Sequence, residues 1–189
     1  MIFESIITTT NPQGLPHVAP FGVRYENGLV VISPFRPSTT LENILSSQFA
    51  VLNIVDDVRV FAGALTGRQP WQLDGVAPRV HLAGALSHAE LVLVEVRDDV
   101  TRPQLLMRKT SEQVHRAFQG FNRAQAAVIE LAVLASRLHM LPKEKVSTEM
   151  QYLQIAMDKT AGEVEQEAWG WLVEKIDNYY AELSGDNQA

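Results

Sequence analysis

The spacing of the hydrophobic residues changes once along this chain, near residue 111, and this change constrains the fold more than any other feature of the sequence. Before it, short β-branched and aromatic runs alternate with turn signals such as Asn27-Gly28, a pattern typical of consecutive antiparallel strands. After it, apolar residues recur at the period of a helix. The sequence therefore predicts a strand-rich domain over residues 1–110 and a helical extension over residues 111–189.

The first part contains seven segments with the composition of strands, and two short helices interrupt them. The expected strands cover residues 2–10, 15–25, 29–33, 49–55, 80–85, 90–97 and 104–108. One expected helix covers residues 38–47, and another, capped by Asp56 and Asp57, runs through Ala64. Many short strands with few helices favour a β-barrel or a sandwich over a parallel sheet.

Three helices are expected in the second part. The first carries its apolar residues at helical spacing and is stopped by Pro142. The second covers about residues 143–159, and Ala161-Gly162 separates it from a third helix over about 163–183. The last residues, 184–189, are expected to fray. The predicted fold is thus mainly β with α, a barrel followed by a three-helix C-terminal appendage.

Composition excludes several classes of function. The formal charge is -6 and no basic run is present, so binding to nucleic acid is not expected. The absence of cysteine excludes disulfides and thiolate metal sites. No basic leader and no apolar stretch of bilayer length occur, so we expect no membrane segment and a cytoplasmic location.

One segment has the residues of an anion-binding site. Arg36 precedes three consecutive hydroxyl residues, Ser38, Thr39 and Thr40, at the start of the expected helix. Thr39 and Glu42 have the spacing of a capping box, which leaves Arg36, Ser38 and Thr40 available to a ligand. Unpaired N–H groups at a helix start, together with a guanidinium, suit a terminal phosphate. The alternative is that the hydroxyls only cap the helix and Arg36 is a surface residue.

The order of several motifs resembles the flavin-reductase-like FMN-binding split-barrel proteins. The segment Arg36-x-Ser38-x-Thr40 followed by Asn43-Ile44 is similar to their phosphate-binding segment, and residues 14–23 are similar to the strand beneath the flavin ring. A narrower family of unknown function, from archaea and methylotrophic bacteria, is similar over nearly the whole chain. It shares the tail segments Asn122-Arg123-Ala124 and Ala127-Val128-Ile129-Glu130.

This resemblance implies an FMN-binding split β-barrel, with the flavin placed between the subunits of a homodimer. It implies phosphate contacts from Arg36, Ser38, Thr39 and Thr40, and contacts to the isoalloxazine ring from Ala19, Pro20, Phe21 and Gly22. Gly22 would allow a close approach of the backbone, and Pro20 removes an N–H from the strand.

Five further residues have two interpretations each. Asn53, a polar residue in an apolar strand, either contacts the flavin or is satisfied by the backbone. His17 and Trp71 are candidates for the substrate pocket, or else a surface residue and a loop anchor. Arg123 and Glu130 share a helical stripe with Arg137 that either lines a pocket or faces solvent.

No metal site is expected from the sequence. His81 and His88 are an odd number of positions apart across Gly84, so one continuous strand could not direct both side chains at the same ion.

The implied activity is that of an FMN-dependent oxidoreductase, in which a nicotinamide donor or another small molecule exchanges a hydride with the flavin. No Gly-x-Gly-x-x-Gly segment follows a strand, so a nicotinamide would bind only transiently. Three alternatives remain: a deazaflavin in place of FMN, a flavin-binding or redox-sensing module without turnover, and a helical tail that serves as a platform for a protein partner.

Overall fold

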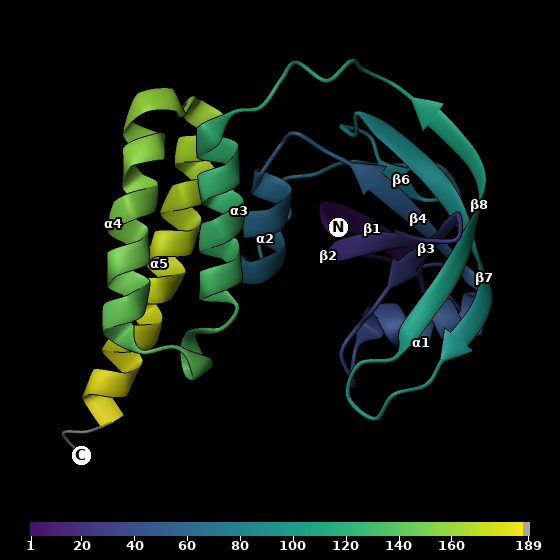
Figure 1. Cartoon of the computed structure of the whole chain (residues 1–189), viewed down its shortest axis with the longest axis horizontal. Coiled ribbons are helices and arrows are strands. Elements are labelled where there is room, and N and C mark those ends of the chain that lie inside the picture. Colours follow the sequence, from purple (N-terminus) through teal and green to yellow (C-terminus); the bar gives the residue numbers. More distant parts are fainter. Residues whose placement is uncertain (187–189) are drawn as a thin grey trace. The chain divides into compact units, whose positions relative to one another are not determined.

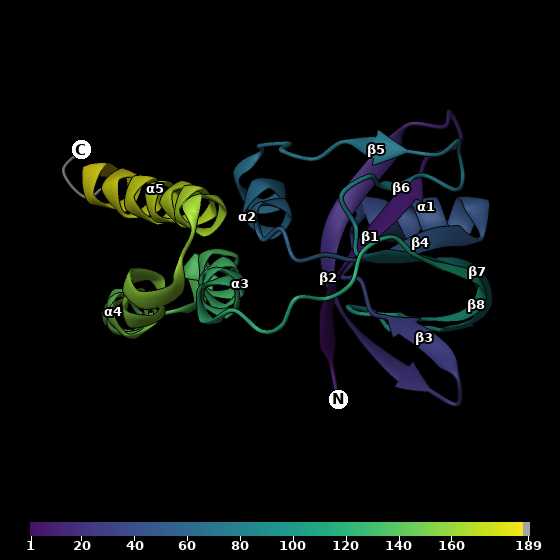
Figure 2. The ribbon, with the colours of Figure 1, turned by 90° about the horizontal axis from the view of Figure 1, so that it is seen from above.

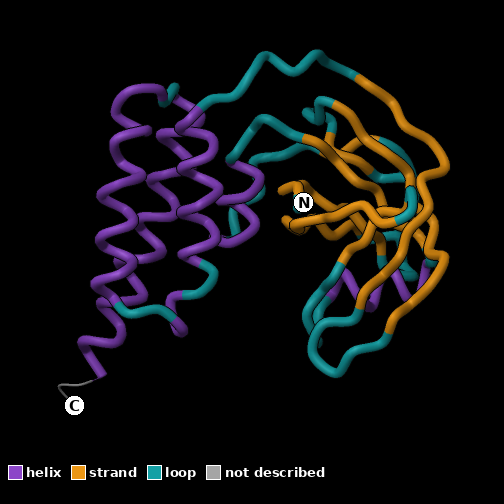
Figure 3. Tube along the Cα trace, viewed as in Figure 1, coloured by secondary structure: helices purple, strands orange, loops and turns teal. Residues whose placement is uncertain are grey.

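The structure is a computed structural model, and it describes residues 1–186 (Figure 1). Contacts within the chain divide it into two compact units. One consists of Met1–Asp56 and Trp71–Phe118, and the other of Asp57–Pro70 and Gln119–Ala189. The first, the barrel unit, contains all the strands and one helix, and the second, the helical unit, contains the other helices (Figure 3).

The elements follow the expected order, with differences in extent. The strands are β1 (Phe3–Thr10), β2 (Pro16–Glu26), β3 (Leu29–Ile32), β4 (Phe49–Ile54), β5 (Leu73–Asp74), β6 (His81–Leu82), β7 (Ser87–Arg97) and β8 (Gln104–Val114). The helices are α1 (Thr39–Ser47), α2 (Arg59–Thr66), α3 (Arg123–Ala135), α4 (Lys143–Thr160) and α5 (Glu163–Asp186), with a 3₁₀ turn η1 (Leu138–Met140).

Three boundaries differ from the sequence-based expectation. The last strand, β8, continues to Val114, because it pairs with β7 along its whole length, and helical structure begins only at Arg123. The strand expected over residues 80–85 is reduced to β6, which pairs with the unexpected strand β5. The frayed end expected from residue 184 is helical through Asp186, and residues 187–189 lie outside the described part of the chain.

Six strands form a closed antiparallel barrel in the order β1-β2-β3-β8-β7-β4, and β4 pairs with β1 to complete it. The tight turn between β2 and β3 uses Asn27 and Gly28, both with positive φ (50° and 78°), the geometry that a two-residue hairpin requires. The turn after β1 is held by the side chain of Asn11, whose Oδ1 accepts hydrogen bonds from the N–H groups of Gln13 and Leu15. The expected barrel fold is confirmed.

The core of the barrel unit joins the strands to α1. Leu41 and Ile44 on one face of α1 are buried together with Ile7 of β1, Leu52 of β4 and Met107 of β8. Burying an aliphatic side chain of this size stabilises a fold by about 1.5–3 kcal/mol. This packing fixes α1, and hence its first turn, against the barrel.

In the helical unit, α2 packs with the three C-terminal helices. Val58 and Ala62 share a buried cluster with Leu131 of α3 and with Leu172 and Ile176 of α5. Figure 2 shows α3 and α4 nearly end-on and α5 obliquely beside them. The expected three helices are confirmed, and α2, predicted as part of the strand-rich region, joins them. None of the helices within residues 1–186 combines the length and the apolar character of a bilayer span.

The barrel closes at a seam between β1 and β4 that contains a buried amide. Asn53 is fully buried and lies opposite Ile6 of β1. Its Nδ2 donates to Thr8 Oγ1 (2.9 Å) and its Oδ1 accepts from the N–H of Leu82 in β6 (2.8 Å). Of the two interpretations of Asn53, the structure therefore supports the structural one, since every polar atom of the amide has a partner within the barrel unit.

A second buried amide holds α1 at the same strand. Asn43 of α1 donates from Nδ2 to Thr9 Oγ1 (3.0 Å), and both residues are buried. Thr8 and Thr9 are neighbours on β1, so their side chains point to opposite faces of the strand. The strand β1 is thus packed against α1 on one face, and on the other face Thr8 is linked to β6 through the Asn53 amide.

Replacing the seam amide should destabilise the barrel. We expect Asn53→Leu, which keeps the branching and the number of side-chain heavy atoms, to lower the free energy of unfolding by about 1–3 kcal/mol, because the Leu82 N–H is left buried without an acceptor. Urea unfolding followed by circular dichroism measures this change. The control Asn178→Leu, at an exposed position of α5, should remain within about 0.5 kcal/mol of wild type. Equal stability of both variants would contradict the assignment.

Candidate functional site

The candidate phosphate-binding segment lies where the chain enters α1. Ser38 is the N-cap, with an extended backbone (φ -159°, ψ 132°), and its Oγ accepts a hydrogen bond from the N–H of Leu41 (3.2 Å). Thr39 is the first residue inside the helix. The predicted capping box, with Thr39 as N-cap and Glu42 as its partner, is therefore wrong by one position: Ser38 is the residue whose hydroxyl reaches the first turn.

With this cap, two backbone N–H groups at the helix start remain without an acceptor in the helix. The hydrogen-bond ladder of α1 begins with the N–H of Glu42, which donates to the carbonyl of Ser38 (3.1 Å). The N–H groups of Thr39 and Thr40 precede it and have no acceptor inside the helix. The side chain of Thr39 is exposed, whereas that of Thr40 is buried. Thr39 thus offers a hydroxyl and an N–H, and Thr40 an N–H, at the positive end of the helix dipole.

Arg36 precedes this helix start, but its guanidinium already has a partner. Its Nη2 lies 2.6 Å from Oδ1 of Asp98, in the loop between β7 and β8. The backbone N–H of Arg36 donates to the carbonyl of Thr101 in the same loop (2.9 Å). The expectation that Arg36 and Ser38 point freely towards a ligand is wrong, because Asp98 engages Arg36 and the helix cap engages Ser38.

A second arginine, Arg102, belongs to this site and was missed by the sequence analysis. Its Nε donates to the carbonyl of Ser33 (2.9 Å), and its guanidinium carbon lies 4.9 Å from the ring centroid of Phe35. Asp99 shapes the loop, since its Oδ1 accepts from the N–H groups of Thr101 and Arg102. These backbone hydrogen bonds lower the pKa of Asp99. The sequence feature that could have indicated Arg102 is its position in the turn between two predicted strands.

The helix start and the loop between β7 and β8 therefore meet at one corner, where Arg36 and Arg102 lie beside Asp98 and Asp99. We call its donors the anion cradle: Arg36, Thr39, Thr40 and Arg102, with Ser38 as the cap. Two guanidinium groups and two backbone N–H groups are the donors that phosphate oxygens accept from most readily in proteins. Arg102 extends the predicted site.

The candidate ring-binding segment, Ala19 to Gly22, lies in the middle of β2 and is partly exposed along its length. The carbonyl of Phe21 accepts a hydrogen bond from Ser5 Oγ (3.0 Å), and Pro20 lies opposite Ile6 without an N–H to donate. A Cβ built at Gly22 would lie 2.7 Å from Cγ2 of Ile2. In this structure it is therefore the side chain of Ile2 that lies close to the backbone at Gly22.

Two of the candidate pocket residues are partly buried in the barrel unit. His17 lies near the start of β2, opposite Thr9, on the strand that carries the ring-binding segment. Burial lowers the pKa of His17, which favours the neutral ring near pH 7. Trp71 lies just before β5 and is half-buried.

Arg123 and Glu130 are exposed on α3, whereas Ala124, Ala127 and Leu131 on its other face are buried in the core of the helical unit. Arg137 lies beyond the end of α3, so the charged stripe stops after two residues. These two charges therefore take no part in the core of the helical unit.

The helical unit has an open cleft of about 730 Å³. It is lined by residues such as Arg68, Ser136, His139 and Glu174. Arg68 pairs with Glu174 across it (2.6 Å), so these charges neutralise each other. None of the residues predicted from the sequence lines this cleft.

Two models of known protein families together match most of the chain. The model described as "Protein of unknown function (DUF447) N-terminal domain" matches residues 3–116. The model described as "Protein of unknown function (DUF447)", for the C-terminal domain, matches residues 122–174.

The individual relatives have low sequence identity to this chain. The uncharacterized protein MJ1453 of Methanocaldococcus jannaschii is 24% identical over 145 residues, which cover 72% of this chain and 75% of that protein. The crystal structure of the FMN-bound protein MM1853 from Methanosarcina mazei is similar with a TM-score of 0.79 at 20% identity, over 92% of this chain and 94% of that one. The flavin reductase SMOB of the styrene monooxygenase from Pseudomonas putida S12 has a TM-score of 0.51 at 10% identity, over 60% of this chain and 81% of its own. These likenesses confirm the split-barrel fold.

Proposed function

The chain belongs to the DUF447 family, and on that premise we propose that it binds FMN at the anion cradle and acts as an FMN-dependent oxidoreductase. The observation that carries the proposal is the cradle itself, found on a fold that is similar over 92% of the chain to a protein whose crystal structure is described as FMN-bound. Bound FMN supplies hydride and electron transfer, and the protein supplies binding and orientation.

In this proposal the phosphate of FMN accepts hydrogen bonds from the N–H groups of Thr39 and Thr40 and from the hydroxyl of Thr39. Arg36 adds a charged donor when its guanidinium turns from Asp98 towards the phosphate. Arg102 is held by the carbonyl of Ser33 and the ring of Phe35, so it contributes positive charge from a fixed position. Ser38 acts indirectly, since its hydroxyl keeps the first turn open towards the ligand.

The isoalloxazine ring is proposed to lie along β2, where Ala19, Pro20, Phe21 and Gly22 leave a partly exposed strand surface. His17 is on the same strand and is the residue best placed to contact a substrate or the ring edge. Its lowered pKa favours a neutral imidazole, which can either accept or donate a hydrogen bond. The small substrate and the nicotinamide donor bind over the ring in this proposal.

We further propose that two copies of the chain form a homodimer with the flavin at the subunit interface. Support comes from the outer surface of β1 and β2, where Ile2, Phe3 and Tyr25 are exposed although they are large and apolar. Phe3 and Tyr25 pack edge to face with ring centroids 5.9 Å apart. Contiguous exposed apolar side chains next to a proposed ligand site are typical of an interface.

Removing the Arg36 guanidinium should weaken FMN binding. We expect Arg36→Ala to lose about 1.5–3 kcal/mol of binding free energy, the value of a charge-assisted hydrogen bond. Asp98→Ala should bind FMN at least as tightly as wild type, because a carboxylate that competes for Arg36 is gone. Titration of apoprotein by flavin fluorescence measures both, with the exposed Arg108→Ala as control. Unchanged affinity in Arg36→Ala would remove this residue from the site.

The proposed activity requires that the bound flavin can be reduced. We expect the purified protein to show the two visible absorption bands of FMN, and these bands to bleach in a stopped-flow experiment with NADH or NADPH. A single band at shorter wavelength would favour a deazaflavin. A bound flavin that neither donor reduces would favour a binding or sensing module without turnover.

The proposed dimer predicts the mass in solution. Sedimentation equilibrium should give about 42 kDa, twice the 21.0 kDa of one chain. Phe3→Lys should shift the protein towards the monomer, because it places a charge in the apolar interface. Val76→Lys, at an exposed position in the loop between β5 and β6, should leave the dimer intact. A monomeric wild-type protein would contradict the shared flavin site.

A further inference from the structure

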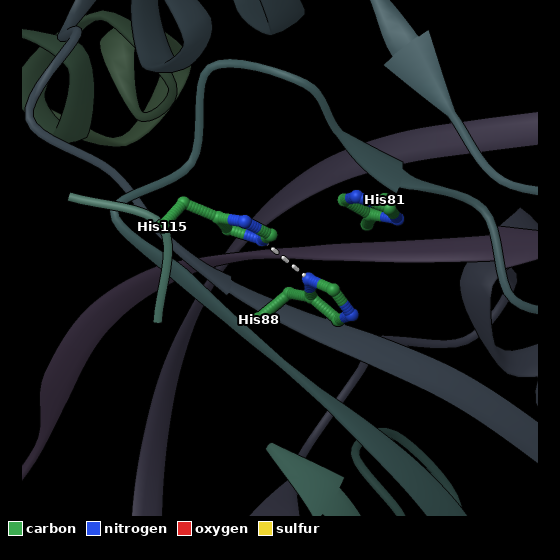
Figure 4. Close-up of side chains that lie close together, drawn as sticks. All are labelled: His81, His88 and His115. Atoms are coloured by element: carbon green, nitrogen blue, oxygen red, sulfur yellow. Dashed lines mark hydrogen bonds between the residues drawn. The ribbon is translucent and has the colours of Figure 1, made fainter. Parts of the chain in front are cut away.

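Three histidines that are distant in the sequence lie together on the barrel unit. His81 comes from β6, His88 from β7, and His115 follows directly after β8 (Figure 4). The ring centroids of His81 and His88 are 4.0 Å apart, those of His88 and His115 5.0 Å, and those of His81 and His115 5.6 Å. One nitrogen from each ring can be chosen such that all three lie within 4.8 Å of one another.

The backbone fixes this arrangement. His88 lies directly opposite Asn53 in the pairing of β7 with β4, and the Asn53 side chain holds β6 through the N–H of Leu82. The N–H of His115 donates to the carbonyl of Leu86 (2.8 Å). Between β6 and β7 the chain turns, with the N–H of Ala85 donating to the carbonyl of Leu82 (3.1 Å). The odd spacing of His81 and His88 was evidence against a shared ion only for one continuous strand, and the two residues belong to different strands.

Two of the rings already interact directly. His88 Nδ1 and His115 Nε2 are 2.8 Å apart, so one of these nitrogens carries the shared hydrogen and the other accepts it. A neutral imidazole with an available lone pair is the form that coordinates metals.

One nitrogen of the cluster lacks a partner. His81 Nδ1 is buried and makes no hydrogen bond within the described residues. Leaving a buried polar atom unsatisfied costs about 1–3 kcal/mol, so a native structure seldom keeps one without a reason. A cation bound through this nitrogen would remove the cost.

We propose that His81, His88 and His115 bind a divalent transition-metal ion of the zinc type, each through one imidazole nitrogen. Zinc–nitrogen distances of about 2.0–2.1 Å place the nitrogens of a tetrahedral site about 3.3 Å apart. The cluster must therefore close by up to about 1.5 Å, with loss of the His88–His115 hydrogen bond. Because the three rings are stacked, with interplanar angles of 1–23°, metal binding also requires the ring of His81 or His88 to turn, as well as that of the exposed His115, so that the in-plane lone pairs face one ion. Three protein ligands leave the fourth position open to water or a small ligand.

The surrounding charges favour this class of metal over magnesium or calcium. The nearby acids already have partners: Asp56 pairs with Arg116 (2.7 Å) and Glu90 with Arg79 (3.1 Å). A site made of imidazoles without carboxylates selects zinc, copper or nickel rather than the hard cations that prefer oxygen. This proposal is independent of the flavin site.

Calorimetry on the intact protein tests the site. Tag-free protein, dialysed against a chelator, is titrated with ZnCl₂, and wild type should bind one ion per chain. We expect His115→Ala to bind zinc at least about tenfold more weakly, since even outer-shell changes have effects of this size. His139→Ala, an exposed histidine in η1, is the matched control and should bind as wild type does. Absent zinc binding in wild type, or an equal loss in both variants, would overturn the proposal.

A second measurement uses wild-type protein alone and so does not depend on how the variants fold. In NMR spectra of the histidine ring C–H groups, zinc should shift the signals of His81, His88 and His115 and leave those of His17 and His139 in place. Shifts confined to His17 and His139 would show that zinc binds elsewhere and would contradict the three-histidine site.

Discussion

The seam between β1 and β4 is the constraint on which the rest of the barrel unit depends. A sheet becomes a closed barrel only if its first and last strands pair, and here the pairing brings the buried amide of Asn53 opposite Ile6. Such an amide is tolerated only with its donors and acceptor satisfied, and Thr8 and the N–H of Leu82 satisfy them. The same interactions that remove the cost of burial also fix which strands are neighbours.

On the inner side of this seam, the position of α1 is set before any ligand arrives. Ile44 is buried in the barrel core, and Asn43 donates to Thr9 of β1. The first turn of α1 therefore has a defined direction, and its free N–H groups need little reordering to receive an anion. Arg36 is the exception, because its guanidinium is paired with Asp98.

Local signals in the sequence predicted the local parts of this structure. Asn27-Gly28 indicated the hairpin between β2 and β3, and the helical period after the barrel indicated the three C-terminal helices. The N-cap of α1 was misplaced by one residue, because Ser38 and Thr39 have equally suitable side chains and only the backbone angles distinguish them. Neighbouring hydroxyl residues do not specify a cap by themselves.

The features that sequence reasoning missed depend on contacts between distant segments. Arg102 joins the cradle because the loop between β7 and β8 folds back to Arg36 and Ser33. The three histidines meet only because β6, β7 and the end of β8 become neighbours. Asn53 had two interpretations until β6 was seen to supply the donor for its oxygen.

The hairpin of β5 and β6 lies over the face of the seam opposite to α1, and it is attached there through the Leu82 N–H. His81 is the residue before Leu82, and His88 pairs with Asn53. The backbone positions of the two histidines are therefore fixed by the barrel strands and not by a flexible loop. Two buried amides thus tie one seam to β6 on its outer face and to α1 on its inner face.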